Sequence, residues 1–147
     1  MTLCNATSEQ RQKAHDMEAI RQLRRRYALS IDTGCLEGLD DVFATRAQVV
    51  VPQGTICGLP AIKSRLEEKY GEMTSSAQPR HPFTHVLLRH DIDLMTDGTA
   101  TGRCYVIDYE VSPTPAARTA VSLRAFHDEY RVVDGCWRIT ATVVEPA

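Results

Sequence analysis

The sequence predicts an α+β domain: a cone-shaped α+β barrel in which a curved, mixed or antiparallel sheet carries three N-terminal helices. Three observations support this fold class. Apolar residues recur at helical spacing in the first half of the chain, whereas apolar and polar residues alternate in the second half, as in strands. Short turns such as Asp134-Gly135 join the strand-like runs and are typical of hairpins. Helices followed by an antiparallel meander define the α+β class.

The first helix is the longest helical pattern. We expect residues 1–14 to form a flexible arm and residues 15–147 a single domain. The helix is predicted to begin near Asp16, a good N-cap, and to stop at Asp32-Thr33-Gly34, where glycine can adopt a left-handed conformation. Its apolar stripe comprises Met17, Ile20, Leu23 or Arg24, Tyr27 and Ile31.

The remaining elements are shorter. A second helix is predicted over residues 36–44, a strand over 47–51, and a turn with a short strand over 52–57. The motif Gly58-Leu59-Pro60 opens a third helix over residues 61–73, because proline is favoured in a first helical turn. Four consecutive strands are then predicted over residues 81–95, 99–112, 118–135 and 136–145.

Composition excludes several classes of function. The formal net charge of −2 and the isoelectric point near 6.2 argue against nucleic acid or a membrane surface as partner. The basic cluster Arg24-Arg25-Arg26 is expected to be a solvated helix face. No run is long and apolar enough for a membrane span, and five cysteines without metal-ligand spacing favour free thiols. We therefore expect a cytoplasmic protein.

Asp32 and His85 are the main candidates for chemistry. A carboxylate at a helix C-terminus meets the negative end of the helix dipole, and a histidine within an apolar strand needs a partner. Both misfits are relieved if the two side chains meet, and a carboxylate that orients an imidazole is an acid–base device. The alternatives are a turn-capping Asp32 and a hydrogen-bonded core histidine. Strand alternation places His90 on the face opposite His85.

Three motifs carry a family resemblance: Tyr27-x4-Asp32-x-Gly34, Gly58-x-x-Ala61-Ile62, and Phe126-x3-Tyr130-x3-Asp134-Gly135-x-Trp137-x-Ile139. Together they resemble the SnoaL-like domain group of the nuclear transport factor 2-like superfamily over nearly the whole chain from Ala19 onward. This resemblance is specific for the fold and weak for the reaction, since one fold hosts many chemistries.

The resemblance also implies site residues. Scytalone dehydratase, hexachlorocyclohexane dehydrochlorinase and the bile-acid dehydratases use an Asp near the first helix end with a His on the first long strand, roles that fall on Asp32 and His85. Similarity to the bile-acid enzymes adds Tyr27 and Asp108 as catalytic candidates. The second histidine of scytalone dehydratase has no clear counterpart here. The family also implies a homo-oligomer, either a dimer or a trimer.

The sequence therefore predicts a lyase of the dehydratase type, acting on a small, largely apolar cyclic substrate through an Asp–His dyad. An isomerase or cyclase acting on a steroid- or polyketide-like ring is the nearest alternative. A ligand-binding or dimerisation module without catalysis, or an oxygenase accessory subunit, is another. The chemistry requires no metal or organic cofactor. The predicted apolar walls of the substrate pocket are Val49, Val51, Val86, Leu88, Val106 and Phe126.

Overall fold

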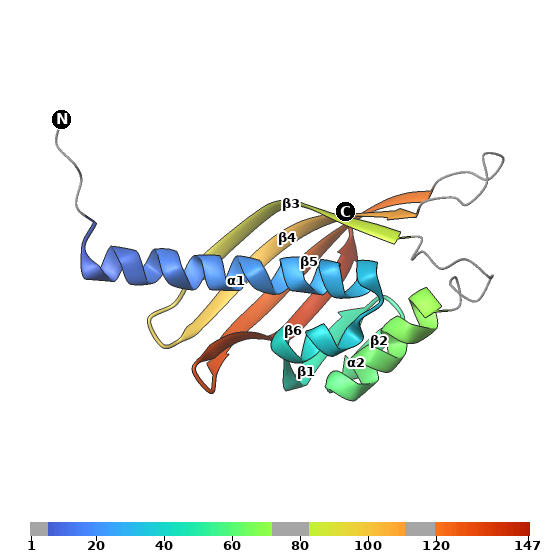
Figure 1. Ribbon diagram of the computed structural model, residues 1–147, viewed down its shortest axis with the longest axis horizontal. Helices are drawn as coiled ribbons and strands as arrows, with labels where there is room; N and C mark the ends of the chain where they lie inside the picture. The colour runs from blue at the N-terminus through green and yellow to red at the C-terminus, as the bar shows by residue number, and fades with distance from the viewer. Residues whose placement is uncertain (1–5, 72–82, 111–119) are drawn as a thin grey trace.

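A computed structural model describes residues 6–71, 83–110 and 120–147 of the protein. A six-stranded sheet curves around the helices without closing (Figure 1), so the predicted α+β class and cone shape are confirmed. The elements in chain order are α1 (Ser8–Thr33), the 3₁₀ segment η1 (Leu36–Asp41), β1 (Phe43–Val51), β2 (Gly54–Cys57), α2 (Leu59–Leu66), the π-helical segment η2 (Glu67–Gly71), β3 (Phe83–Leu94), β4 (Thr99–Glu110), β5 (Ala120–Val133) and β6 (Cys136–Pro146).

Helix α1 starts earlier than the sequence predicts. It begins at Ser8 because Thr7 and Gln10 form a capping box, in which each side chain bonds the other residue's backbone N–H. Residues 8–14, expected in a flexible arm, are thus the first turns of α1. Asp16, expected as the N-cap, lies inside the helix and accepts a hydrogen bond from Trp137 Nε1 at 3.0 Å. The helix ends as predicted, with Gly34 at a left-handed φ of 72°.

The segment between the first and third helices differs in detail from the prediction. The expected second helix is a 3₁₀ segment that stops at Asp41, and β1 begins at Phe43 rather than at residue 47. The third helix becomes π-helical from Glu67 and reaches Gly71, the last described residue of this segment. Its predicted last residues, 72 and 73, lie outside the described residues.

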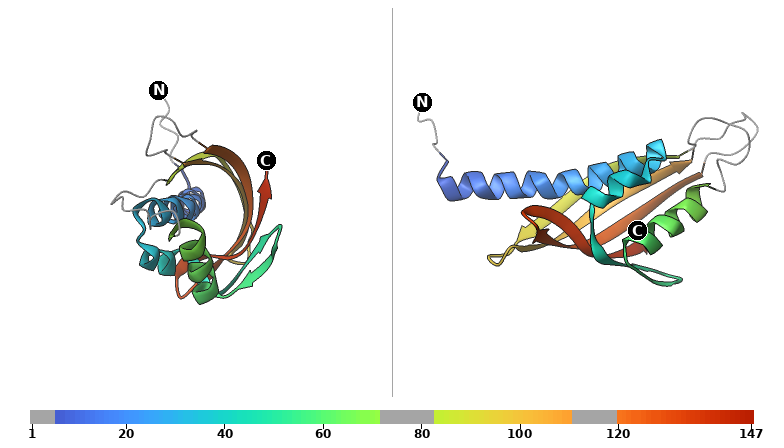
Figure 2. Two further views of the ribbon diagram at one scale, coloured as in Figure 1. Left: turned by 90° about the vertical axis from the view of Figure 1, so that its right-hand side faces the viewer. Right: turned by 60° about the horizontal axis from the view of Figure 1, so that its bottom comes forward.

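The sheet has the strand order β2-β1-β6-β5-β4-β3. Strands β3 to β6 form the predicted antiparallel meander, while β1 pairs with β6 in parallel and with β2 antiparallel. Strands β3 and β6 each carry one extra residue relative to the neighbouring strand, between Leu87 and His90 in β3 and between Ala141 and Ile139 in β6. Such bulges bend a strand and increase its twist. Figure 2 shows the resulting curvature around α1 and α2.

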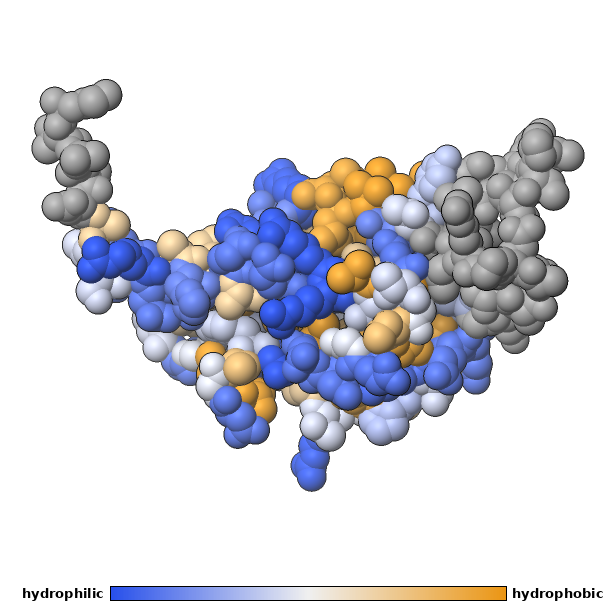
Figure 3. Space-filling view, in the orientation of Figure 1, coloured by the Kyte–Doolittle hydropathy of each residue, from blue (hydrophilic) through white to orange (hydrophobic). Residues whose placement is uncertain are grey.

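The core lies between α1 and the concave face of the sheet. Ile20, Leu23 and Ile31 are buried on α1, where their helical spacing forms one apolar stripe. The outer face of α1 is hydrophilic (Figure 3), and within the described residues no helix is both long and apolar enough to cross a bilayer. Val86, Leu88, Tyr109 and Val121 are exposed apolar residues on the convex face of the sheet, because they alternate with residues of the concave face.

Candidate active site

The structure brings Asp32 and His85 into direct contact. Asp32 lies in the last turn of α1 and His85 near the start of β3. The His85 Nδ1 atom is 2.6 Å from Asp32 Oδ1, and the His85 backbone N–H donates to both carboxylate oxygens at 3.1 Å. The carboxylate, unfavourably placed at the end of the helix, therefore receives hydrogen bonds from both the backbone and the side chain of one strand residue.

This contact fixes the tautomer of the imidazole. An ionised carboxylate only accepts hydrogen bonds, so the Nδ1 atom of His85 carries the proton and donates it to Asp32. In the neutral ring the Nε2 atom is then left with a lone pair. It lies 3.2 Å from the hydroxyl oxygen of Tyr70 and 3.6 Å from Asp108 Oδ1. The basic end of the imidazole therefore faces a tyrosine and a second carboxylate.

Tyr70 belongs to the candidate site and was not predicted from the sequence. It lies in η2, and burial raises the pKa of its phenol, which keeps the hydroxyl protonated as a hydrogen-bond donor. This hydroxyl donates to Asp108 Oδ2 at 3.4 Å, so its one proton is shared between this carboxylate and the lone pair of His85 Nε2. Ile62, Leu66 and Tyr70 recur every fourth residue, so helical spacing could have placed Tyr70 on the sheet-facing stripe of the third helix.

Asp108 reaches the same cluster from β4. It pairs with His85 in the strand register, which places both side chains on the concave face of the sheet. Arg124 on the neighbouring strand has its Nη2 atom 3.6 Å from Asp108 Oδ2. Among the described residues, the buried Oδ1 atom of Asp108 has no hydrogen-bond partner. Asp108 therefore keeps an acceptor site next to the Nε2 atom of His85.

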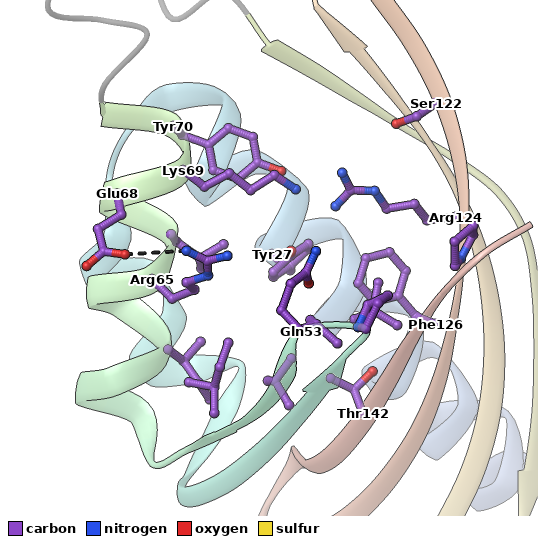
Figure 4. Close-up of a pocket in the computed structure, with 18 of the residues that line it drawn as sticks. Tyr27, Gln53, Arg65, Glu68, Lys69, Tyr70, Ser122, Arg124, Phe126 and Thr142 are labelled. Atoms are coloured by element: carbon purple, nitrogen blue, oxygen red, sulfur yellow. Dashed lines mark hydrogen bonds and ion pairs between the residues drawn. The ribbon is translucent and has the colours of Figure 1, made fainter.

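A cavity of about 590 Å³ opens beside this cluster. Tyr27, Tyr70 and Phe126 form part of its wall (Figure 4), together with side chains from β1 and α2. His85 does not itself line the cavity, because the rings of Tyr27 and Tyr70 stand edge-on to the imidazole, with centroids 6.4 and 5.6 Å away. Asp32 and Asp108 are likewise absent from the lining. The two tyrosines thus separate the imidazole from the space that would hold a ligand.

Only some of the predicted wall residues lie at the cavity. Val49, Val51 and Phe126 line it. Val106 is buried in the core and does not line the cavity. Val86 and Leu88 are exposed at 44% and 52% and do not line it either. Val86 points away because it follows the inward-facing His85 on an alternating strand.

Comparison with known proteins places the chain in a family. The sequence profile of the SnoaL-like domain matches residues 12–143. The protein belongs to the SnoaL-like domain family. A search of curated protein sequences found no match.

Solved structures similar to this SnoaL-like domain show the same fold at low sequence identity. An NTF2-like protein with a cystatin-like fold from Novosphingobium aromaticivorans superposes with a TM-score of 0.80 at 19% identity, over 99% of this chain and 92% of the other. A protein provisionally assigned as a scytalone dehydratase from the same organism gives 0.76 at 19% identity, over 92% and 86% of the two chains. LinA, a dehydrochlorinase, gives 0.73 at 14% identity, over 92% and 88%.

A second polar cluster of this SnoaL-like domain lies beside the cavity and corrects the prediction for Arg24. Arg24 is fully buried rather than solvated, and its guanidinium donates two hydrogen bonds to the buried carboxylate of Asp128 and one to Thr142. It also packs over the Tyr27 and Phe126 rings, 4.9 and 4.1 Å from their centroids. Its position on the apolar stripe, four residues after Ile20, could have revealed this burial. The ion pair of Arg24 and Asp128 therefore supports the rings of Tyr27 and Phe126, which line the cavity.

His90 joins this second cluster, against the prediction that it faces away from His85. The extra residue in β3 between Leu87 and His90 reverses the alternation, so His90 returns to the concave face. Its Nε2 atom lies 2.9 Å from the Tyr130 hydroxyl, which itself donates to Asp128 Oδ2. His90 Nε2 must therefore be the donor in the first contact. Burial lowers the pKa of His90, which favours the neutral ring.

Two tyrosines of β4 that could also donate a proton lie away from this site. Tyr105 and Tyr109 alternate with the inward-facing residues of β4 and lie on its convex side. The described residues contain no group of three or more His, Cys, Asp or Glu side chains arranged to hold a metal ion. The described cysteines are free thiols, as predicted, and burial raises the pKa of Cys104 to about 11.

Proposed function

We propose that the protein is a lyase that removes water or a hydrogen halide from a small, largely apolar cyclic substrate. The carrying observation is the short Asp32–His85 contact, which leaves the imidazole Nε2 atom basic and directed at Tyr70 and Asp108. The fold shared with a dehydrochlorinase and with a protein provisionally assigned as a dehydratase supports this reaction class. The cavity beside the dyad supplies the binding space.

In the proposed reaction His85 is the general base. Its Nε2 atom takes a proton from the carbon next to the one that bears the leaving group, the C–H electrons form the double bond, and the bond to the leaving group breaks. Asp32 stabilises the imidazolium because its carboxylate accepts the Nδ1 proton throughout. The proton on Nε2 is adjacent to Asp108, which passes it to a departing hydroxide so that water leaves; a halide departs as the anion, and the proton then goes to solvent. The base is thereby returned to its neutral form.

Tyr70 has to give way before Nε2 can reach the substrate. Its contacts with His85 and Asp108, at 3.2 and 3.4 Å, are longer than the usual 2.7–2.8 Å for a hydroxyl donor. Replacing them by a contact with substrate therefore costs little free energy. Once displaced, the hydroxyl can donate to a substrate carbonyl oxygen on which negative charge develops. Its raised pKa keeps the donor proton in place. Loss of such a donor typically lowers kcat by about 10²–10³-fold.

The test is a screen of cyclic β-hydroxy ketones and cyclic halides, followed by the ultraviolet absorbance of the conjugated product. Turnover by the wild type should fall by at least about 10²-fold in His85→Ala. Tyr70→Phe should lower kcat more than it changes KM. His127→Ala is the matched control, because His127 also contacts a carboxylate, Glu145, but is partly exposed and does not line the cavity. Equal activity of His85→Ala and wild type would refute the assignment of the base.

Isomerisation is the second candidate, and one observation favours it. The unpartnered Asp108 Oδ1 beside His85 Nε2 could return the abstracted proton to a different carbon of a substrate that has no leaving group. Exchange of substrate hydrogen for deuterium in D₂O, without elimination, would distinguish this reaction. If no substrate in the panel turns over or exchanges, and a ligand binds equally well to His85→Ala, the protein is a binding module.

A further inference from the structure

The cavity is lined by more positive than negative charge, although the whole chain has a formal net charge of −2. Two of its cations are neutralised within the fold. Arg24 is bound by the buried Asp128, and Arg65 lies 3.4 Å from Glu68, the acidic residue among those lining the cavity. Two further cations of the lining remain after these pairs are set aside.

These two cations are Lys69 and Arg124. They reach into the cavity from opposite walls, Lys69 from η2 and Arg124 from β5 (Figure 4). Arg124 lies 3.6 Å from Asp108, a carboxylate that is also 3.6 Å from His85. Lys69 makes no ion pair within the described residues, and its ammonium lies 5.1 Å from the centroid of the Tyr70 ring. Two cations thus share one nearby carboxylate.

The lowered pKa of Lys69 indicates that the positive charge in the cavity is not fully neutralised by nearby carboxylates. Burial, followed by the repulsion of Arg124, lowers the pKa of Lys69 to about 8, against the smaller opposing effect of Asp108. A bound anion would stabilise the charged form of Lys69, because its attraction opposes the effects of burial and of Arg124 on the pKa.

We propose that the substrate carries an anionic group, a carboxylate in the simplest case, bound between Lys69 and Arg124. Its apolar rings would then lie against the aromatic and aliphatic wall that includes Phe43 and Val49. This inference rests on the proposed function and extends it by assigning a charge to the substrate. Because Asp108 contacts both Arg124 and His85, the bound anion lies close to the group that removes the proton.

Two fluorescent probes that differ by one charged group test this proposal directly. They are 8-anilinonaphthalene-1-sulfonate and the uncharged N-phenyl-1-naphthylamine, which has the same rings without the sulfonate. In fluorescence titrations at pH 7 the wild type should bind the anionic probe about 10- to 100-fold more tightly than the neutral one. 1-Naphthoate should displace the anionic probe, whereas inorganic phosphate alone and methyl 1-naphthoate should displace it poorly.

Substitutions assign the preference to the two cations. Lys69→Gln and Arg124→Gln should each weaken the anionic probe several-fold and together abolish the preference, with the neutral probe unchanged. The charge-retaining variants Lys69→Arg and Arg124→Lys should keep it. Arg46→Gln is the control, because Arg46 is exposed on β1 and does not line the cavity. Thermal melting of each variant checks that it is folded.

Each outcome has a definite meaning. Equal binding of the two probes by the wild type overturns the proposal, and so does an equal loss of both probes in the glutamine variants. Binding of inorganic phosphate with the affinity of 1-naphthoate would overturn the assignment to a ring-bearing acid. The His85→Ala variant should retain the probe preference. A charge preference without turnover in the substrate screen would thus contradict the proposed function alone, whereas turnover of neutral substrates without a preference would contradict this inference alone.

Discussion

The buried pair of Arg24 and Asp128 allows a sharp prediction about stability. Both side chains have no exposed surface, and the carboxylate also accepts a hydrogen bond from Tyr130 at 2.8 Å. In Asp128→Asn the shape of the side chain is kept, but the guanidinium is left as an uncompensated buried charge. Breaking a buried ion pair in this way typically costs about 3–5 kcal/mol in free energy of unfolding.

This loss is large for a domain of this size. Total stabilities of about 5–15 kcal/mol are typical, and a domain of about 150 residues loses roughly 2–4 °C in Tm per kcal/mol, so Tm should fall by roughly 6–20 °C. Replacing both partners by apolar residues of similar volume, as in Arg24→Met with Asp128→Leu, should recover much of the loss, because no charge is then buried. Glu145→Gln, which breaks an exposed pair with His127, should cost less than about 1 kcal/mol.

Urea unfolding followed by circular dichroism measures these differences, and it also tests their pH dependence. Burial alone would raise the pKa of Asp128, but the charge and hydrogen bonds of Arg24 outweigh it and hold the pKa below its usual value. The stabilisation is therefore full above the unfolded pKa of about 3.9 and is lost as pH falls through the lower folded pKa. The gap between wild type and Asp128→Asn should shrink in acid. A cost below about 1 kcal/mol at pH 7, or a double variant no more stable than the single one, would refute the reasoning.

Two further predictions concern protons at the cavity. Long-range ¹H–¹⁵N spectra should show His85 as the Nδ1–H tautomer and His90 as the Nε2–H tautomer. In Asp32→Asn the amide can donate to Nδ1, so His85 should shift toward the Nε2–H tautomer. Identical tautomers for both rings would contradict the assigned hydrogen bonds. Since Lys69 has a pKa of about 8 and loses its charge as pH rises, affinity for the anionic probe should fall between about pH 7 and pH 9 while Arg124 preserves part of it. Lys69→Arg should flatten this profile, and a profile unchanged by that substitution would assign the titration to another group.

The fold and the central contact of the candidate site follow from patterns with a direct physical cause. The spacing of apolar residues and the residue types at turns predicted the meander and the end of α1, because both depend only on residues close together in the sequence. The meeting of Asp32 and His85 was expected because each residue is poorly placed without a partner. The burial of Arg24 was equally legible from its place on the apolar stripe, but the charged cluster of three arginines suggested a solvated face instead.

Other parts of the site depend on geometry that alternation and spacing do not carry. Helical spacing could have placed Tyr70 on the sheet-facing stripe, but no local pattern specifies that its hydroxyl meets His85. The face of His90 was predicted wrongly because a single extra residue in β3 cannot be recognised from an alternating sequence. Val86 and Leu88 were expected at the cavity since they are apolar, yet the apolar residues of a sheet that is open on its convex side need not face the core.

The extra residue in β3 affects how the sequence of this strand can change in evolution. It divides the strand into two stretches of opposite phase, so the parity of a residue number no longer reports which side it faces. Loss of one residue at this point would rotate every position on one side of it by half a period, moving His90 outward while the pairing of His85 with Asp108 stayed intact. The two polar clusters can therefore diverge independently, and alignments that assume unbroken alternation will pair functionally unrelated positions.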